Sequence, residues 1–423
     1  MWWAMPFPQT RRRPSRRARV YTVRMKKHLA ALLVLTLSAA VRVAAQDLTI
    51  TNARIIGPNG TVIERGSIVV RGGKIVAAAA GAPSSPAGTT IDAKGMTAMP
   101  GFIDAHRHIN TGPNEKAQMQ AQLEAGYTTI LSGGGPADGN ITLRDHIEKG
   151  VINGPRIIPS GQIRLANNTP EMAREQIRKM AELGVKYTGE IALTPEPGPS
   201  PQEIETLKAI VDEAKKAGVT VQVHAVSSVA MMAAVDAGVR RLVHVPNKSW
   251  VTHADALKLA ATGTHILGTI GFGAPIFGVF EHDNNPRFRD GKPWPASIVG
   301  ADLLDGVPVG QEIGYTTVNS RTLWDAGAAL GYCTDSTYDA LAGLEHELKT
   351  YNMMFSMQDI VKLMGPNTAA YIQMSDQLGT LESGKIADIV LLDGNPLEGY
   401  WNWLKTKVTI KGGVVVVDKR NTK

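Results

Sequence analysis

The chain is poor in cysteine. Cys333 is its only cysteine among 423 residues, which excludes an internal disulfide framework. It also excludes a lipid-modified cysteine at the end of an N-terminal leader. Internal repeats and low-complexity tracts are missing as well. The remaining composition, 43% hydrophobic and 20% charged residues, is ordinary for a globular protein with one large domain or two moderate ones.

Acidic residues are absent from the first 45 positions, although ten Lys and Arg residues lie there. The whole chain has a formal net charge of +7, so the chain after these 45 residues carries −3. The part that is expected to fold is therefore mildly acidic. It offers no basic surface that would point to nucleic acid as a partner.

The N-terminal segment also lacks an apolar run long enough to span a membrane. Two lysines follow Met25, and a short apolar run over 29–40 leads to small residues at 43–45. This is the pattern of a secretory signal peptide. We expect residues 1–45 to be a leader segment. The signal peptide within it is expected to start at Met25 and to be cleaved after Ala45. The mature protein would then lie in the periplasm or be secreted, free of the membrane; a permanent N-terminal anchor is the alternative.

Short strand signals dominate both ends of the mature chain, where apolar stretches alternate with Gly, Pro and Asn residues. These stretches are residues 48–56, 67–80, 89–100, 386–397 and 407–419. Gly-Gly and Asp-Gly pairs within them favour tight hairpin turns. We therefore expect residues 46–98 and 377–423 to form one small β-sandwich domain together.

The middle of the chain alternates short apolar strands with amphipathic helices, which is the pattern of parallel βα units. Eight strands are predicted, over residues 99–106, 127–133, 155–161, 185–191, 220–226, 241–246, 265–270 and 328–336. Helix signals separate them, such as the capping sequence that begins at Ser200 and the stop at Gly218. Eight consecutive units predict an α/β fold with a (β/α)8 TIM barrel over residues 99–376.

Histidine and carboxylate side chains stand at the ends of these strands, where such barrels carry their active sites. His106 and His108 lie two positions apart, so both point to one face of an extended strand. The others are Glu190, His224, His244 and Asp335, on or just after strands four, five, six and eight. Each alone could be structural: a core histidine, a glutamate paired with lysine, or an aspartate that caps a helix. Together at one barrel mouth they would satisfy one another through a metal.

Three motifs give the chain a resemblance to the amidohydrolase superfamily of metal-dependent hydrolases. MPGFIDAHRH at 99–108 resembles the strand-one signature, and GPRIIPSG at 154–161 is similar to the strand-three region. LGTLESGKIADIVLLDGNPL at 378–397 looks like the closing segment that returns to the small β domain. The order His-x-His, Glu, His, His, Asp agrees with these motifs. The resemblance extends from about residue 48 to the C-terminus.

The resemblance implies a role for each strand-end residue. His106 and His108 match ligands of a first metal ion, whereas His224 and His244 match ligands of a second. Asp335 matches the strand-eight aspartate that touches the first metal and transfers protons. The implied site therefore holds two metal ions.

The residue that bridges the two metals has two candidates. Many members of the superfamily use a carboxylated lysine on strand four. Here the matching position appears as Glu190, which resembles enamidase-like branches that hydrolyse cyclic amides. Lys186 is the competing bridge, because its even offset from Glu190 would put both side chains on one strand face.

These assignments predict an exported binuclear hydrolase with two divalent ions, zinc by default and iron, manganese or cobalt as alternatives. A metal-bridging hydroxide would attack the carbonyl of an amide or cyclic amide, with Asp335 as general base and then general acid. We expect a small-molecule substrate, and a homo-oligomer stays open. The alternatives are a dipeptidase, lactonase or phosphotriesterase on the same metals, and a non-catalytic metal-binding relative.

The segment between strands seven and eight is long for a barrel loop. It holds cationic and aromatic side chains that could bind a substrate carboxylate or simply be solvated. They are Arg287, Arg289, Lys292, Trp294, Tyr315 and Arg321. We also expect Cys333 to be a small buried residue and His253 and His282 to be surface residues.

Overall fold

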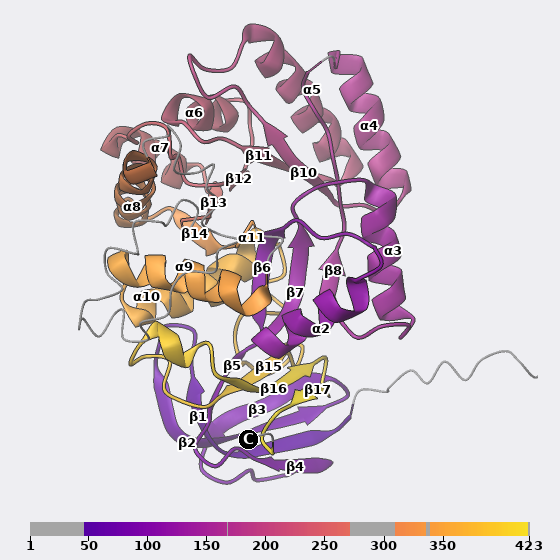
Figure 1. The fold of residues 1–423 in the computed structure, drawn as a ribbon, viewed down its shortest axis with the longest axis vertical. Helices are drawn as coiled ribbons and strands as arrows, with labels where there is room; N and C mark the ends of the chain where they lie inside the picture. Colours follow the sequence, from indigo (N-terminus) through magenta and orange to yellow (C-terminus); the bar gives the residue numbers. More distant parts are fainter. Residues whose placement is uncertain (1–45, 167, 271–308, 336–338, 422–423) are drawn as a thin grey trace, which may run out of the picture. The chain divides into compact units, whose positions relative to one another are not determined.

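The computed structural model describes residues 46–166, 168–270, 309–335 and 339–421, with only the backbone for 309–313. These residues form an α/β fold whose strands belong to one mixed sheet and two parallel sheets (Figure 1). None of the helices in these ranges is both long and apolar enough to cross a bilayer. The leader that we predict over residues 1–45 lies outside the described residues.

Both ends of the described chain meet in the mixed sheet, where indigo and yellow strands lie side by side (Figure 1). Its strands are β1 (Leu48–Ile56), β2 (Val62–Arg71), β3 (Lys74–Ala80), β4 (Thr89–Asp92), β5 (Thr97–Pro100), β15 (Ile389–Leu392), β16 (Thr406–Lys411) and β17 (Val414–Asp418). The order is β17-β16-β15-β5-β1-β2-β3, with β4 beside β1. The C-terminal strand β15 pairs antiparallel with β5, so the two terminal segments share one sheet, as predicted.

Glycine pairs make the tight turns of this sheet. Gly72 and Gly73 join β2 to β3 with φ values of +53° and +77°, and Gly412 and Gly413 join β16 to β17 with +57° and +80°. Two successive residues with positive φ define the hairpin turn that matches the twist of antiparallel strands, and glycine adopts it without steric cost. The Gly-Gly hairpins predicted from the sequence are therefore confirmed.

The parallel strands form two sheets. Strands β6 (Phe102–Arg107), β7 (Tyr127–Ser132) and β8 (Arg156–Ile158) make the first. Strands β9 (Ser160–Gly161), β10 (Tyr187–Ala192), β11 (Thr220–His224), β12 (Arg241–Val243), β13 (His265–Gly268) and β14 (Ala329–Tyr332) make the second, in chain order. All eight predicted strand regions contain strands, and the third region contains both β8 and β9.

The strand predicted over residues 99–106 is divided in the structure. Its first residues belong to β5 of the mixed sheet, whereas β6 begins at Phe102. Gly101 lies between them, and its N–H donates to the Asp388 carbonyl at 2.9 Å. A side chain at Gly101 would collide with Thr128, because a Cβ there would lie 2.3 Å from the Thr128 Oγ1. The continuous apolar run MPGFI therefore serves two sheets, while the domain boundaries at 98/99 and 376/377 stay predictions.

Helices connect the parallel strands and lie along their outer side (Figure 1). The connecting helices are α2 (Glu115–Ala125), α3 (Ala137–Glu148), α4 (Pro170–Glu182), α5 (Pro201–Ala217), α6 (Ser228–Asp236), α7 (His253–Ala261) and α8 (Val309–Asp325). After the last parallel strand come α9 (Ala340–Met354), α10 (Met357–Lys362) and α11 (Thr368–Tyr371). A π-helical turn, η4 (Leu363–Asn367), joins α10 to α11, and a 3-10 turn, η5 (Tyr400–Asn402), precedes β16. Apolar residues between helices and strands, such as Ile177, Leu207 and Val223, are fully buried.

The predicted helix ends agree with the structure. Ser200 and Glu203 form a capping box at the start of α5, and Gly218 ends this helix with φ +68°. The capping box and the Gly218 C-cap each satisfy backbone groups that lack partners inside the helix. These helix ends set the length of the connections that bring successive strand ends to one face.

Candidate metal centre

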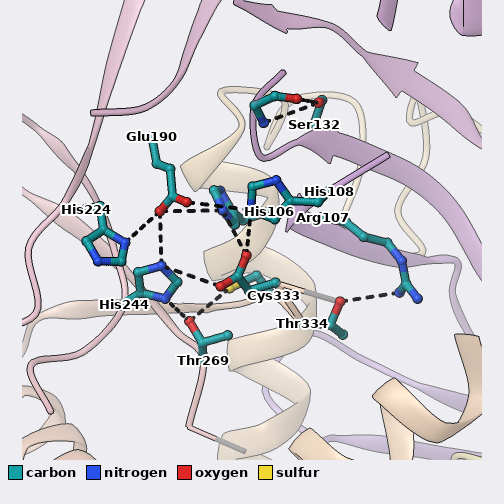
Figure 2. A network of polar contacts seen from close by, with 12 residues as sticks. His106, Arg107, His108, Ser132, Glu190, His224, His244, Thr269, Cys333 and Thr334 are labelled. Atoms are coloured by element: carbon teal, nitrogen blue, oxygen red, sulfur yellow. Dashed lines mark hydrogen bonds and ion pairs between the residues drawn. The ribbon is translucent and has the colours of Figure 1, made fainter. Parts of the chain in front are cut away.

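The six predicted site residues come together at the carboxyl ends of the parallel strands (Figure 2). They are His106 in β6, His108 just after it, Glu190 in β10, His224 at the end of β11, His244 after β12 and Asp335 after β14. Parallel strands carry their carboxyl ends on one side, which is where barrel enzymes place their sites. Residues up to 229 positions apart in the chain thus meet because each lies at a strand end.

The six side chains divide into two overlapping groups of possible metal ligands. His106, His108, Glu190 and Asp335 form the first, and Glu190, His224 and His244 form the second. Within each group the ligand atoms all lie within 4.8 Å of one another. Glu190 belongs to both groups. This is the arrangement expected of a carboxylate between two ions.

The contacts of Glu190 show how it is shared. Its Oε2 lies 2.8 Å from His224 Nδ1 and 3.1 Å from His244 Nε2. Its Oε1 lies 3.5 Å from His108 Nε2. Oε2 also lies 3.8 Å from His106 Nε2, so the carboxylate contacts histidines of both groups. Within the part of the chain that the structure describes, Glu190 pairs with histidines and with no lysine, so the alternative of a simple Glu–Lys pair does not describe the structure.

Asp335 occupies the opposite side of the cluster. Its Oδ1 lies 2.9 Å from His108 Nε2 and 3.3 Å from His106 Nε2, and its Oδ2 lies 3.6 Å from His244 Nε2. The N-cap of α9 is Asp339, so the helix-capping alternative for Asp335 is wrong. The Asp335 side chain is instead directed at three imidazole rings.

Two of the site residues have an unusual backbone conformation. His244 has φ +70° and Asp335 has φ +48°. Residues other than glycine rarely adopt this left-handed region, and such outliers concentrate at functional sites. His244 directly follows β12 and points into the cluster (Figure 2), and Asp335, three residues after β14, contacts the cluster histidines.

Several buried polar atoms in the cluster make no hydrogen bond with other described residues. They are Nδ1 and Nε2 of His106 and Oδ1 of Asp335; the close contacts of Asp335 Oδ1 with the two imidazoles do not have hydrogen-bond geometry. Buried polar atoms normally have partners, because an unsatisfied group costs free energy. A cation among the rings and carboxylates would satisfy these atoms. Imidazole nitrogens and carboxylate oxygens are the donors that zinc and similar divalent ions prefer, so the residues fit a metal.

The electrostatics of the cluster also favour a cation. Burial acts to raise the pKa of Glu190, but contacts with three histidines outweigh it and hold that pKa well below its usual range. The same balance holds the pKa of Asp335 below its usual range. Contacts with Asp335 and then Glu190 raise the pKa of His108 to about 10, whereas burial lowers the pKa of His244. Both carboxylates thus stay ionised.

A second set of contacts orients the ligands. The His244 Nδ1 forms a hydrogen bond with the Thr269 hydroxyl, which leaves Nε2 directed at Glu190. Cys333 lies beside Thr269, with 3.8 Å between Sγ and Oγ1. Cys333 is fully buried, and burial raises the pKa of its thiol well above the usual value. This agrees with the prediction of a small buried residue, since a reactive thiol needs a depressed pKa and access.

Glycines let the backbone approach the cluster. A Cβ at Gly133, just after β7, would lie 2.7 Å from the His106 Nε2. A Cβ at Gly189, next to Glu190, would lie 2.8 Å from the Gly134 Cα. Contacts this close do not occur for real Cβ atoms, so both positions require glycine for packing reasons. The Glu190 N–H donates to the Gly133 carbonyl at 3.1 Å, which fixes β10 beside this turn.

The competing bridge, Lys186, lies at the amino end of β10, whereas the ligand groups lie at the carboxyl ends of the strands. It is exposed and precedes β10, which begins at Tyr187. The pairing of β10 with β11 also contains a register irregularity between Tyr187 and Glu190. An even sequence offset therefore does not by itself put Lys186 and Glu190 on one strand face here, and the choice between the two bridges stays a prediction.

The other candidates fall outside the cluster. His253 is exposed at the start of α7, as predicted. Arg321 pairs with Asp325 on α8 at 2.6 Å, so its guanidinium is engaged there. His282, Arg287, Arg289, Lys292 and Trp294 lie outside the described residues, and Tyr315 packs against Trp250 with ring centroids 4.4 Å apart.

A cavity of about 710 Å³ adjoins the cluster. His108, Glu190 and His224 form one wall, and residues from the segment after β9 and from the β10–α5 connection form the others. This volume is within the range of small-molecule sites. The arrangement can therefore hold cations at the wall of a cavity that accepts a small organic molecule.

Comparison with known proteins agrees with this geometry. The model of the amidohydrolase family matches residues 97–416. Imidazolonepropionase of Caldanaerobacter subterraneus subsp. tengcongensis is 24% identical over 422 residues, covering 84% of this chain and 91% of its own. Enamidase of Eubacterium barkeri is 25% identical over 398 residues, covering 85% and 92%. A Bifidobacterium longum protein assigned as a prolidase has a similar structure, with a TM-score of 0.73, 25% identity and coverage of 89% and 97%.

Proposed function

The chain belongs to the amidohydrolase family, and on that basis we propose that it hydrolyses a carbon–nitrogen bond in an amide or cyclic amide. The family membership confirms the predicted hydrolase class. One observation carries the proposal: two ligand groups share Glu190 at the wall of a cavity of about 710 Å³. A single carboxylate common to two groups supports a binuclear centre.

Two divalent ions, zinc by default, suit the donor set. The residues that would hold them are His106, His108 and Asp335 for the first ion, His224 and His244 for the second, and Glu190 between them. When bound, such ions supply Lewis acidity toward a substrate carbonyl and lower the pKa of water. Thr269 holds His244 in the orientation that this requires.

Asp335 is the group that we assign to proton transfer. It is ionised and 13% exposed, with its two oxygens directed toward His106, His108 and His244. An ionised carboxylate at this place can accept the proton of an attacking water and then deliver it to the leaving nitrogen. Glu190, with contacts to four histidines, is committed to the ligand groups and is less free for this task.

The enamidase-like assignment rests on Glu190 and on the similarity to a named enamidase over 85% of the chain. It favours cyclic amides among the substrates. The similarity to a structure assigned as a prolidase supports dipeptide hydrolysis as the second candidate. Both reactions break a carbon–nitrogen bond beside a carbonyl group, so they need the same protein groups.

We further propose that the parallel strands close into one barrel. In support, the Asp335 N–H donates to the His106 carbonyl at 2.9 Å, which joins the ends of β14 and β6. For the mixed sheet we propose a sandwich around the apolar cluster that includes Ile50, Ile68 and Ile389. The leader over residues 1–45 supports export to the periplasm or beyond, with a small molecule as partner and neither nucleic acid nor a membrane.

A substrate panel on the metal-loaded protein tests the proposed function. It contains the cyclic amides glutarimide and hydantoin, simple dipeptides, N-acyl amino acids, a lactone and a phosphotriester, with Asp335→Asn as the matched inactive variant. We expect turnover of at least one amide and its loss in Asp335→Asn. Turnover of only the lactone or the phosphotriester would contradict amide specificity. No turnover together with no bound metal would favour the non-catalytic alternative.

A further inference from the structure

The cavity beside the ligand groups is lined by an arginine, Arg164, that has no role in the proposed function. Among the described residues that line the cavity, Arg164 is the one lysine or arginine. It lies in the segment that follows β9, and the same cavity is lined by Thr194 of the β10–α5 connection and by Glu203 of α5. The cavity therefore has a cationic side chain in addition to the histidines of the candidate metal centre.

The backbone at Arg164 is firmly held. Its neighbours Ile163 and Leu165 are buried, whereas the arginine side chain is exposed. The carbonyl of Arg164 accepts a hydrogen bond from the buried Asn168 Nδ2 at 2.8 Å, and Asn168 pairs with Gln176 of α4. Alternation of buried and exposed residues turns the guanidinium away from the core and toward the cavity that it lines.

The guanidinium of Arg164 makes no hydrogen bond or ion pair with other residues in the described ranges. Arginine has five N–H donors in a planar fork that suits a carboxylate. An arginine on a protein surface can be satisfied by water alone. In a cavity that takes an organic molecule, the same free donors can bind part of that molecule instead.

Glu203, an acid that lines the same cavity, is already engaged. The Glu203 carboxylate accepts hydrogen bonds from the Thr194 N–H and hydroxyl, both at 3.0 Å, and from the Ser200 N–H at 2.7 Å. Burial acts to raise the pKa of Glu203, but these hydrogen bonds outweigh it and lower the pKa. Glu203 is thus a fixed negative charge that repels an anionic group on its side and favours placing such a group beside Arg164.

We propose that Arg164 binds a carboxylate of the substrate, so that the enzyme acts on amides whose amine part carries an acid, such as N-acyl amino acids. The proposal rests on the amide hydrolysis proposed above. A bidentate, charge-assisted hydrogen bond would orient the molecule across the cavity, with its amide toward the ligand groups. The role of Arg164 is substrate binding and specificity.

Two probes that differ only in the carboxylate test this inference: N-benzoyl-L-leucine and N-(3-methylbutyl)benzamide. Hydrolysis and equilibrium binding are measured for both on the metal-loaded full chain. The variants are Arg164→Met, Arg164→Lys as the conservative exchange, and Arg178→Met as a control. Arg178 is an exposed arginine on α4 that does not line the cavity.

We expect the wild type to prefer the acid by about ten- to a hundredfold in kcat/KM, the factor that one charge-assisted hydrogen bond supplies. Arg164→Met should remove this preference, chiefly through a higher KM for the acid. Arg164→Lys should keep part of it, and Arg178→Met should keep all of it. Equal preference in wild type and Arg164→Met would overturn the inference and leave amide hydrolysis intact.

The binding measurement separates this inference from the proposed function. If neither probe is hydrolysed but the acid binds wild type about tenfold more tightly than Arg164→Met, the carboxylate site stands and amide hydrolysis fails for this class. If neither probe is hydrolysed and binding is equal in the two proteins, the carboxylate site is overturned as well.

Discussion

The carboxylate of Asp104 is bonded to Thr334, and this contact joins the first parallel strand to the segment after the last one. Asp104 Oδ2 accepts a hydrogen bond from the Thr334 hydroxyl at 2.5 Å, and Oδ1 accepts one from the Thr334 N–H at 3.1 Å. Asp104 precedes His106 by two residues, and Thr334 directly precedes Asp335. The pair therefore fixes the spacing between a candidate metal ligand and the proposed proton-transfer group.

Replacement of Asp104 by asparagine should weaken both stability and metal binding. Asp104 is fully buried and also contacts the buried guanidinium of Arg107 at 3.2 Å. Removing one partner of a buried ion pair costs about 3–5 kcal/mol, because the other charge stays buried without compensation. Asp104→Asn should lower the free energy of unfolding by an amount of this order, and reduce zinc affinity. Chemical denaturation and a zinc titration measure the two effects.

Asp388 offers a matched control for this prediction. Its carboxylate is also buried and contacts Arg156 at 2.7 Å. Arg156 is the first residue of β8, whereas the ligand groups lie at the opposite ends of the strands. Asp388→Asn should therefore destabilise the protein without changing zinc affinity. Equal loss of zinc in the two variants would show that Asp104 acts only through general stability.

A methyl group at Gly133 should disturb the candidate metal centre with little effect on the backbone. The added Cβ would lie 2.7 Å from His106 Nε2, so the imidazole must move. We expect Gly133→Ala to bind less metal per chain and to lose most activity. Gly112→Ala is the control, because a Cβ there has no atom within 4 Å. Full metal content in Gly133→Ala would show that His106 does not need its present position.

Acid should destabilise the protein partly through His265. Burial lowers the pKa of His265 to about 4, compared with an unfolded value of about 6.5. Between these values the unfolded chain binds a proton that the folded chain does not, so stability falls as pH decreases from about 6.5 to about 4. The contribution is complete above the unfolded pKa. His265→Gln should make this decline shallower, as followed by denaturation at several pH values, whereas exposed His253→Gln should leave it unchanged.

The meeting of the six candidate ligands could be expected from the sequence, because each stands at the end of a short apolar strand. Strand ends in parallel βα units share one face. The position of Glu190 or His244 along its own strand was therefore enough to predict that its side chain lies at this face. The chemistry of the side chains then indicated a metal. No exact geometry was needed for this conclusion.

The residues that support the ligands were missed. Asp104 stands inside the apolar run GFIDAH, and a carboxylate there needs a buried partner; that signal was present, but its partner Thr334 is 230 residues away. Gly133 and Thr269 carried no comparable signal, since their roles depend on distances across neighbouring strands. The even-offset argument for Lys186 has a similar weakness, because a register irregularity in β10 cannot be read from the sequence.

Metal content per chain, measured by plasma mass spectrometry on wild type and Glu190→Ala, tests the central claim most directly. The account predicts about two divalent ions in wild type, from two ligand groups with one shared carboxylate, and a clear loss in Glu190→Ala. Two ions retained in the variant would contradict the role of Glu190 as the shared ligand. No metal in the wild type would contradict the metal centre itself, and with it the proposed hydrolysis.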